Sequence, residues 1–315
     1  MRILITGATG LVGQEIVAQC HRKGYNVSFL TTRKEKIATQ DNYKGFYWNP
    51  AKGIIDENCL EGVVTIINLA GASISKRWTT AYKKEIIDSR VQSLETLYRC
   101  VQESKSHTIE KIISASAIGI YPSSLSRLYN EEEVAVDQSF LGEVVDIWET
   151  KIAAFKKLDL KVSAVRIGLV MSEDGGALPE IAKPIKNYVG AAFGSGAQWQ
   201  SWIHIKDLAR MFLYVGDANL TGVFNGVARN PITNTRLVKE IAKVLEKPLI
   251  LPNIPEFIMQ FILGDMSYIL FASQRVSSKK IEDAGFSFYY SNIGNALEAI
   301  YSGKEMNISE MSASV

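Results

Sequence analysis

Met1-Arg-Ile-Leu-Ile-Thr-Gly-Ala-Thr-Gly-Leu-Val-Gly13 is the stretch from which the fold of this 315-residue chain can be predicted. Residues 2–6 form a short apolar, β-branched run, which is typical of a buried strand. Glycines follow at positions 7, 10 and 13, and an apolar helical pattern then begins at Ile16. A strand, a glycine turn and a helix in this order are the setting in which such a triplet binds a dinucleotide.

Each of the three glycines has its own physical reason. Gly7 permits a tight turn, Gly10 leaves no side chain between backbone and ligand, and Gly13 lets the helix pack closely on the strand. We also expect a positive φ at Gly10. The helix directs free N–H groups and its positive dipole end at the ligand, which suits a pyrophosphate. A plain strand-to-helix turn is the alternative. The predicted first segment of a dinucleotide site is Gly7, Thr9, Gly10, Leu11 and Val12.

The end of the next predicted strand, residues 26–31, indicates which dinucleotide binds. An NAD site usually carries an acid there, which accepts hydrogen bonds from the adenosine ribose. Here the strand runs into Thr32, Arg33 and Lys34, and the first acid is Glu35. Arg33 and Lys34 suit the extra 2′-phosphate, because a guanidinium binds phosphate oxygens bidentately. We therefore predict NADP(H) in preference to NAD(H); an ordinary charged surface loop is the alternative.

Composition narrows the functional classes. The chain is 47% hydrophobic and 22% charged, as is ordinary for a soluble globular enzyme, and its net charge of +2 gives no electrostatic case for nucleic acid. The widely spaced Cys20, Cys59 and Cys100 show no metal-binding spacing, which predicts reduced thiols and no metal site.

No apolar run in the sequence approaches the roughly 20 residues of a membrane span. The strand begins at Met1, which leaves no room for a signal peptide, so we expect a cytoplasmic protein. A homodimer is possible, and the sequence does not decide the oligomeric state.

Predicted strands and helices alternate along the first half of the chain. Strands are expected at 45–48, 63–68, 111–116 and 161–166, and helices at 14–23, 79–103 and 140–157. This alternation predicts an α/β fold with a doubly wound parallel (Rossmann) sheet.

The second half of the chain shows a different sequence pattern. It shows a glycine-rich loop region from 175 to 196, after an earlier polar loop at 128–137, and further elements at 208–215, 222–226 and 233–246. Because the chain exceeds what one core usually serves, we expect two domains. Residues 1–170 form the NADP-binding Rossmann domain, to which 199–230 return. Residues 171–302 mostly form a smaller, discontinuous C-terminal substrate or lid domain, and 303–315 a disordered tail.

Further cofactor contacts are expected where parallel strands end, because ligands bind in the crevice outside their carboxyl ends. Small residues follow the strand at 63–68 and let the backbone approach a ligand. Arg90, on the long helix, is a phosphate-binding candidate, although a solvated arginine is the favoured reading. The residues added to the cofactor site are Leu69, Ala70, Gly71, Arg90, Ser114, Ala115 and Arg166.

Several of these motifs together resemble the extended short-chain dehydrogenase/reductases: Gly7–Gly13, Asn68–Gly71, Ser114–Ser116 with Tyr121, and Trp202–Asp207. The chain is more closely similar to their atypical branch of epimerase family proteins (nucleoside-diphosphate-sugar epimerase-like). That branch is matched by Arg77-Trp78, Ser89-Arg90, Trp148-Glu149, Gly175–Leu178, Gly194–Gly196 and Ala284–Phe286. The resemblance implies a Rossmann fold that binds NAD(P) and says little about the reaction.

The chain departs from the wider family at its catalytic residues. Its members usually combine a Ser or Thr with Tyr-x-x-x-Lys on the next helix, where Tyr exchanges the hydroxyl proton. Here residues 143–154 contain no tyrosine, and Ile147 stands four residues before Lys151. The catalytic candidates are Tyr121, which leaves the strand at 111–116, Ser116 or Ser114 in the serine role, and Glu149 as an acid/base. The alternatives are that Tyr121 merely packs beside the nicotinamide and that Glu149 is a satisfied polar group.

The region around His204 favours structural roles. His204 lies between two apolar residues just before a predicted helix, so we expect it to pack or cap rather than to catalyse. Asp207 is placed as an acid at the helix N-terminus.

Two functional hypotheses follow. The first is an NADP(H)-dependent epimerase-like oxidoreductase acting on a small polar or sugar-nucleotide-like substrate, favoured by the glycine loops and by Trp199 and Trp202 in the expected lid. The second is a non-catalytic NADPH-binding sensor or scaffold, favoured by the missing Tyr-x-x-x-Lys, since a fold alone does not guarantee a reaction.

Overall fold

The computed structural model describes residues 1–104 and 107–303, and it divides into two compact units. Unit 1 comprises Met1–Ile120, Val136–Arg166 and Ala209–Phe224. Unit 2 comprises Tyr121–Ala135, Ile167–Leu208 and the chain from Asn225 onward. The tail predicted for 303–315 lies, from residue 304 on, outside the described residues. No helix within the described ranges is both long and apolar enough to cross a membrane.

Unit 1 is built on a nine-stranded sheet in the order β13-β9-β7-β6-β1-β2-β4-β3, with β5 paired to β4. Strands β1, β2, β4, β6 and β7 run parallel, whereas β3 and β5 are antiparallel to β4. In register, Ile5 lies opposite Phe29 on one side and Ile67 on the other. The strands are β1 Arg2–Thr6, β2 Asn26–Thr31, β3 Thr39–Gln40, β4 Tyr43–Asn49, β5 Ile54–Ile55, β6 Val63–Asn68, β7 Lys111–Ala117, β9 Lys161–Ile167 and β13 Gly222–Gly226.

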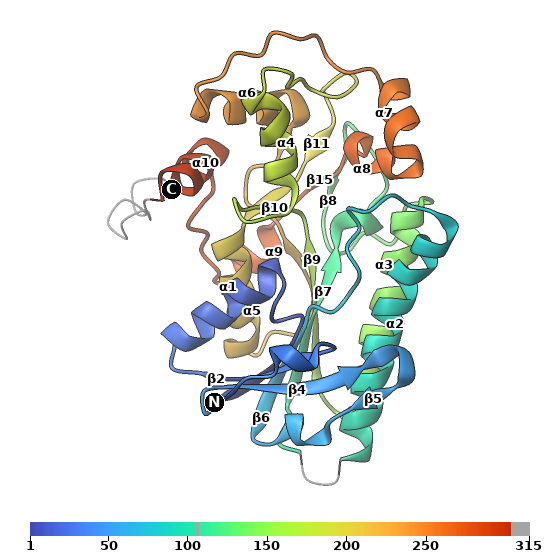
Figure 1. The fold of residues 1–315 in the computed structure, drawn as a ribbon, viewed down its shortest axis with the longest axis vertical. Helices are drawn as coiled ribbons and strands as arrows, with labels where there is room; N and C mark the ends of the chain where they lie inside the picture. Colours follow the sequence, from blue (N-terminus) through green and yellow to red (C-terminus); the bar gives the residue numbers. More distant parts are fainter. Residues whose placement is uncertain (105–106, 304–315) are drawn as a thin grey trace. The chain divides into compact units, whose positions relative to one another are not determined.

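Helices cover both faces of this sheet (Figure 1). Helices α2 (Thr80–Glu103) and α3 (Phe140–Ala153) pack side by side on one face, and α1 (Leu11–Arg22) lies on the other. The central strands are buried on both faces, which explains why they are continuous apolar runs rather than alternating ones. The predicted doubly wound parallel sheet is confirmed.

Unit 2 consists of three two-stranded sheets and several short helices. The pairs are β10 (Leu169–Met171) with β12 (Trp202–His204), β11 (Trp199–Gln200) with β14 (Ile232–Thr233), and β8 (Leu128–Tyr129) with β15 (Arg275–Val276). The α-helices are α4 Ala177–Lys186, α6 Asn234–Val244, α7 Glu256–Leu263, α8 Tyr268–Phe271, α9 Lys279–Asp283 and α10 Ile293–Ser302, and α5 (Ile205–Asp217) begins here and continues into unit 1. The 3₁₀ helices of the two units are η1 Lys34–Lys36, η2 Pro50–Lys52, η3 Glu57–Leu60, η4 Ile118–Ile120, η5 Ala154–Leu158 and η6 Gly264–Ser267.

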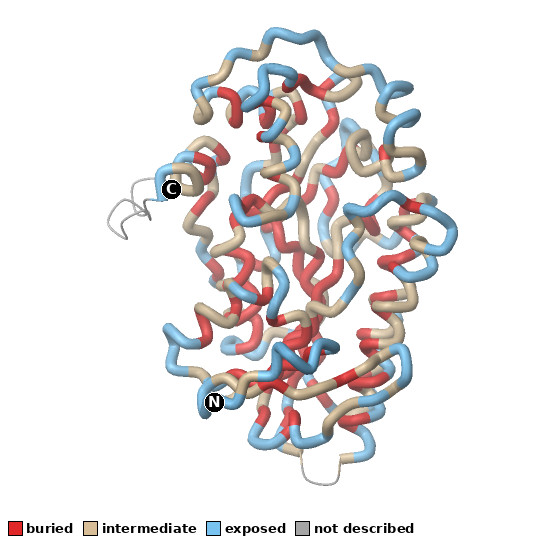
Figure 2. Tube along the Cα trace, in the orientation of Figure 1, coloured by how far each residue is buried: buried red, intermediate tan, exposed pale blue. Residues whose placement is uncertain are grey.

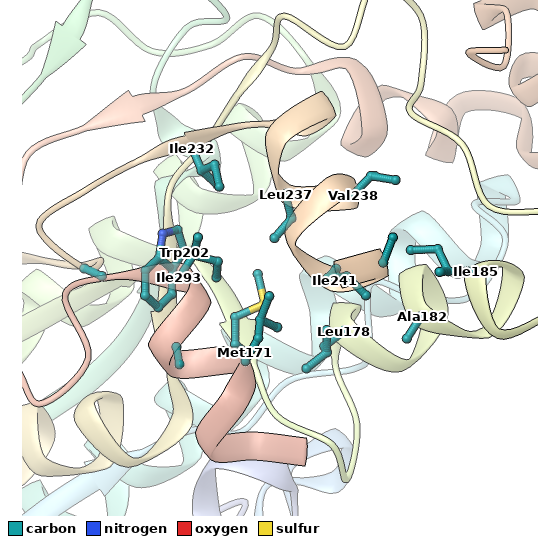
Figure 3. Packing of buried hydrophobic residues seen from close by; sticks show 14 of the residues in the cluster. Met171, Leu178, Ala182, Ile185, Trp202, Ile232, Leu237, Val238, Ile241 and Ile293 are labelled. Atoms are coloured by element: carbon teal, nitrogen blue, oxygen red, sulfur yellow. The ribbon is translucent and has the colours of Figure 1, made fainter. Parts of the chain in front are cut away.

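An apolar core holds unit 2 together where α4, α6 and α10 meet around β10 and β12 (Figure 3). Trp202 is fully buried in it, and its indole N–H donates to the carbonyl of Asn230 at 2.9 Å. A buried indole needs such an acceptor. Trp202 is therefore a core residue of this unit.

Several predicted boundaries need correction. The glycine-rich region contains helix α4, although Pro184 lies inside it, because Leu178, Ala182 and Ile185 form an apolar face that is buried in the core. The loop predicted at 128–137 contains the strand β8, which pairs with β15. Tyr121–Ala135 therefore belongs to unit 2. Helix α1 begins at Leu11, directly after the glycine turn, rather than at residue 14.

Two of the three cysteines are neighbours in space, which their wide sequence spacing did not indicate. All three are free and buried, and the thiols of Cys59 and Cys100 are hydrogen-bonded to each other. Burial raises the pKa of the Cys20 thiol to about 12, so this thiol is protonated at neutral pH.

Candidate cofactor and proton-transfer site

The turn between β1 and α1 has the geometry expected of Gly7 and Gly13. Gly7 has φ of 72°, and a Cβ there would lie 3.1 Å from the carbonyl oxygen of Leu69. At Gly13 a Cβ would lie 2.1 Å from the carbonyl oxygen of Gly7, so only glycine lets the helix approach the turn this closely.

Gly10 differs from expectation in one respect. It is the N-cap of α1 with φ of −85° and ψ of 173°, an extended conformation that any residue adopts. The predicted positive φ is therefore wrong, because the left-handed residue of the turn is Gly7. A Cβ at Gly10 would have one neighbour within 4 Å, the carbonyl oxygen of Gly7 at 3.3 Å. The space above Gly10 is open.

The start of α1 has the properties of an anion-binding site. No side chain caps it, and its first turn contains no acid. The first N–H groups of a helix have no intrahelical partner, so those of Leu11 and Val12 are available to an acceptor. The side-chain amide of Gln14 donates to the carbonyl of Thr9 at 3.0 Å and so braces the exposed turn.

Arg33 and Lys34 follow the carboxyl end of β2, and both are exposed. The Thr31 hydroxyl accepts from the Arg33 backbone N–H at 3.1 Å, which shapes the turn. Lys34 Nζ lies 5.1 Å from the centre of the Tyr47 ring. Within the described part of the chain, the Arg33 guanidinium has no carboxylate within 4 Å.

A buried hydrogen-bond chain joins the carboxyl ends of β1, β6 and β7. The Thr6 hydroxyl donates to Asn68 Oδ1 at 2.7 Å, and Asn68 Nδ2 donates to Ser114 Oγ at 2.9 Å. The Thr6 oxygen also accepts from the N–H groups of Leu69 and Ala70 at 3.0 and 3.1 Å. These contacts fix the loop after β6. The sequence patterns did not indicate this role for Thr6 and Asn68, although a polar residue at the end of an apolar strand is a visible signal.

Arg90 is buried, with 9% of its surface exposed, so the expectation of a solvated arginine is wrong. Its NH1 donates to the carbonyls of Ala72 and Ile86, and its guanidinium lies 4.8 Å from the centre of the Trp148 ring. Burial lowers its pKa to about 10, which still leaves it charged at neutral pH. A Cβ at Gly71 would lie 3.1 Å from Arg90 Cζ, so the loop and the guanidinium are in close contact.

Two buried donors in this contact have no hydrogen-bond partner: Arg90 Nε and Trp148 Nε1. An unpaired buried donor costs about 1–3 kcal/mol, so such groups call for an acceptor. Arg90 lies directly beside the loop after β6, where parallel sheets bind their ligands.

Ser116, Glu149 and Arg166 form a compact polar cluster in unit 1. Ser116 Oγ donates to Glu149 Oε1 at 2.6 Å. Arg166 clamps the same carboxylate with two hydrogen bonds of 2.8 Å, from Nε to Oε1 and from NH2 to Oε2. Both serines are buried, with 2% of Ser116 and none of Ser114 exposed, and Ser114 is already bonded to Asn68 and the carbonyl of Ala115. Of the two serines, Ser116 is the one hydrogen-bonded to an ionisable side chain.

Tyr121 is not open to solvent, which fits the alternative that it is a packing residue. Its side chain is fully buried in unit 2, where it stacks on Tyr129 with ring centres 5.3 Å apart. Its hydroxyl donates to Asn225 Oδ1 at 2.7 Å. The chain leaves β7 through the 3₁₀ turn Ile118–Ile120, which carries Tyr121 into the packing around β8. Lys151 likewise bonds elsewhere: its ammonium pairs with Glu95 on α2 at 2.6 Å.

His204 and Asp207 have the structural roles that the sequence favoured. His204 is buried, stacks on Tyr290 at 3.9 Å between ring centres, and accepts at Nδ1 from the Lys206 N–H. Asp207 is fully buried, and its carboxylate accepts from the N–H groups of Tyr289 and Tyr290 at 2.8–3.0 Å. Burial, with a smaller contribution from Lys206, lowers the pKa of His204 to about 3.

The depressed pKa of His204 predicts a loss of stability in mild acid. The unfolded chain takes up a proton here near pH 6.5 and the folded chain only near pH 3, so stability falls as pH drops between these values. From pH 7 to pH 5, the free energy of unfolding should fall by about 2 kcal/mol more in the wild type than in His204→Asn, which keeps an acceptor for Lys206. Urea titrations at both pH values measure this difference. Equal pH dependence in the two proteins would show that His204 is not held neutral.

Comparison with known proteins then decides the family. The model of the NAD dependent epimerase/dehydratase family matches residues 3–225. The chain belongs to this family. A domain of unknown function, DUF1731, matches residues 254–300, which include α7 to α9 and most of α10.

Two bacterial relatives in this epimerase/dehydratase family align along almost their whole length. An epimerase family protein of Staphylococcus aureus is 36% identical over 300 residues, covering 95% of this chain and 98% of its own. One from Bacillus subtilis is 34% identical over 306 residues, covering 97% and 99%. Among solved structures, a human epimerase family protein with NADPH has a TM-score of 0.83 at 24% identity, covering 96% of this chain and 100% of its own. A nucleoside-diphosphate sugar epimerase from Corynebacterium glutamicum has a TM-score of 0.77 at 27% identity, covering 99% and 61%.

Proposed function

We propose that this epimerase-family protein binds NADP(H) at the turn between β1 and α1 and catalyses oxidoreduction of a small polar or sugar-nucleotide-like substrate. The observation that carries the proposal is the start of α1, which is uncapped, free of acids and open above Gly10. Arg33, exposed after the neighbouring strand β2, supplies a cation without a carboxylate partner among the described residues. The NADPH in the similar human protein supports this choice of cofactor.

The residues of unit 1 fit such a cofactor. The Gly10 N–H donates to the Gly7 carbonyl at 2.9 Å, so the backbone N–H groups of Leu11 and Val12 would hold the pyrophosphate, and Arg33 with Lys34 the 2′-phosphate. Arg90 Nε and Trp148 Nε1 are buried donors that need an acceptor, and the glycine at position 71 leaves the loop beside them free of a side chain. The same edge of the sheet contains the remaining predicted contact residues, Leu69, Ala70, Ser114, Ala115 and Arg166.

The bound cofactor supplies a hydride donor or acceptor, and the protein must then move a proton. Ser116 Oγ is the proposed contact for the substrate oxygen. When a hydroxyl is oxidised, its proton passes to Ser116 while the Ser116 proton passes to Glu149, 2.6 Å away. Arg166 holds the carboxylate in place through two bonds. The reverse transfers serve reduction. In this proposal the pair replaces the Tyr-x-x-x-Lys arrangement, and Tyr121 stays a packing residue.

Cofactor preference gives a direct test. We expect NADPH to bind at least about tenfold more tightly than NADH, because a charge-assisted pair with the 2′-phosphate contributes about 1.5–3 kcal/mol. Arg33→Ala should remove most of this preference while NADH affinity stays unchanged. Lys36→Ala, which removes another exposed cation of the same segment, is the matched control and should change neither affinity. Calorimetric titration of the three proteins with NADPH and with NADH measures the six affinities. Equal affinities in the wild type would contradict the proposed preference.

A non-catalytic NADPH sensor or scaffold is the second candidate, favoured by one observation: the Tyr121 hydroxyl is buried and bonded to Asn225. NADPH consumption over a panel of sugar nucleotides and aldehydes separates the two. Tight NADPH binding without turnover on any of them would favour the sensor.

A further inference from the structure

Helix α7 exposes its apolar side chains to solvent. None of its eight residues is buried (Figure 2). The exposed fractions are 69% for Phe257, 37% for Ile258, 88% for Phe261 and 54% for Ile262. A helix shorter than about 12 residues gains little from its own hydrogen bonds, and helices in proteins are normally stabilised by burying an apolar face. Contiguous apolar surface of this kind marks an interaction site.

The helix is nevertheless held firmly at one end. After Gly264 the chain continues through η6 into α8, which is tied to the body of unit 2 (Figure 1). The Gln198 amide donates to the carbonyl of Leu270 at 2.9 Å, and Phe271 contacts Phe193 edge to face at 6.4 Å between ring centres. Within the described residues, the main packing partner of α7 is η6. The apolar side chains of α7 therefore face outward.

The charge around α7 argues against an acidic partner. Residues 248–274 contain two acids, Glu256 and Asp265, and no Lys, Arg or His. An anionic membrane attracts segments rich in Lys and Arg, at about 1 kcal/mol per cation, and a nucleic acid likewise needs cations. The segment therefore offers apolar contact and no cation to an acidic partner.

We propose that α7 is the centre of a homodimer interface in which the helix packs against α7 of a second copy. Phe257 with Phe261, and Ile258 with Ile262, stand four residues apart and form two ridges, and a twofold axis lets identical ridges interdigitate. At about 200 Å² for a fully exposed large apolar residue, the four side chains offer on the order of 500 Å² per copy. Two copies reach about 1,000 Å², the size a specific interface needs.

Light scattering and sedimentation of the full chain test this. The wild type is expected to have twice the monomer mass of 34.9 kDa at about 100 µM protein. Phe261→Glu should weaken association at least tenfold and leave the melting temperature of the monomer unchanged, because a side chain that is 88% exposed loses no packing. Phe257→Glu should act in the same way. Val134→Glu alters an equally exposed apolar residue outside α7 and should leave the mass at that of the dimer.

Salt adds a second readout. Raising NaCl from about 50 to 500 mM should strengthen the dimer, because it screens the acids that flank both helices and leaves the apolar contact intact. A monomeric wild type at about 100 µM would overturn the proposal. So would a dimer that survives both glutamate variants. Binding of the monomer to phosphatidylcholine vesicles, lost in Phe261→Glu, would assign α7 to a neutral lipid surface instead and would equally overturn it.

Discussion

Gly10→Val is expected to weaken NADPH binding at least about a hundredfold while the protein stays folded. Position 10 has φ of −85° and ψ of 173°, which valine adopts without strain. Its Cβ would meet a single atom, the Gly7 carbonyl oxygen at 3.3 Å. The rest of the valine would occupy the space above the start of α1, where we place the pyrophosphate. Losing the hydrogen bonds to this charged group costs about 3 kcal/mol, which is roughly a hundredfold in affinity.

The neighbouring glycine provides the contrast. A Cβ at Gly13 would lie 2.1 Å from the Gly7 carbonyl oxygen, so Gly13→Ala should lower the melting temperature as well as cofactor affinity. Gly10→Ala, which adds one methyl group, should fall between the wild type and Gly10→Val in affinity. Calorimetry with NADPH, paired with thermal unfolding, distinguishes the two positions. Unchanged NADPH affinity in a folded Gly10→Val protein would move the cofactor away from this turn.

The sequence predicts the sheet well where burial alone decides the pattern. Strands β1, β2 and β6 have the predicted bounds, because a strand buried on both faces is mostly an apolar run. The edge strand β13 also has the predicted bounds, although it is only partly buried. Helix α4 was missed since Gly175, Gly176 and Pro184 are typical of loops, whereas its apolar face is recognisable only against α6 and α10. The two-residue strands β8 and β15 carry no periodic signal, and each exists because its distant partner does.

The site was predicted less completely for a related reason. The sequence indicates which residues end a strand but not which way a side chain on a helix points. Arg90 was expected in solvent because it lies on a long charged helix, yet it is on the face that covers Trp148. The sequence indicates Glu149 as an acid/base candidate and Arg166 as a cofactor contact, but not that the two side chains pair. Their bidentate pairing joins α3 to β9, and no local pattern shows it.

The pairing of Glu149 with Arg166 must be taken into account in a test of the proton-transfer role. Glu149→Gln should lower turnover by about two to four orders of magnitude, because an amide cannot take the proton of Ser116. NADPH affinity should change little. The variant also leaves the Arg166 guanidinium without its counter-charge, and breaking a buried pair typically costs about 3–5 kcal/mol. Activity must therefore be compared at equal folded fraction, measured by thermal unfolding in the same buffer.

Two companion variants separate catalysis from stability. Ser116→Ala removes the proposed proton relay and leaves the Glu149–Arg166 pair intact, so it should lose turnover of similar magnitude without a large change in melting temperature. Glu149→Gln combined with Arg166→Gln should recover stability, since no buried charge is left unpaired, while turnover stays low. If the double variant regained activity along with stability, the cluster would serve only to join α3 to β9. Turnover that stays low in all three folded variants would assign the proton to Ser116 and Glu149.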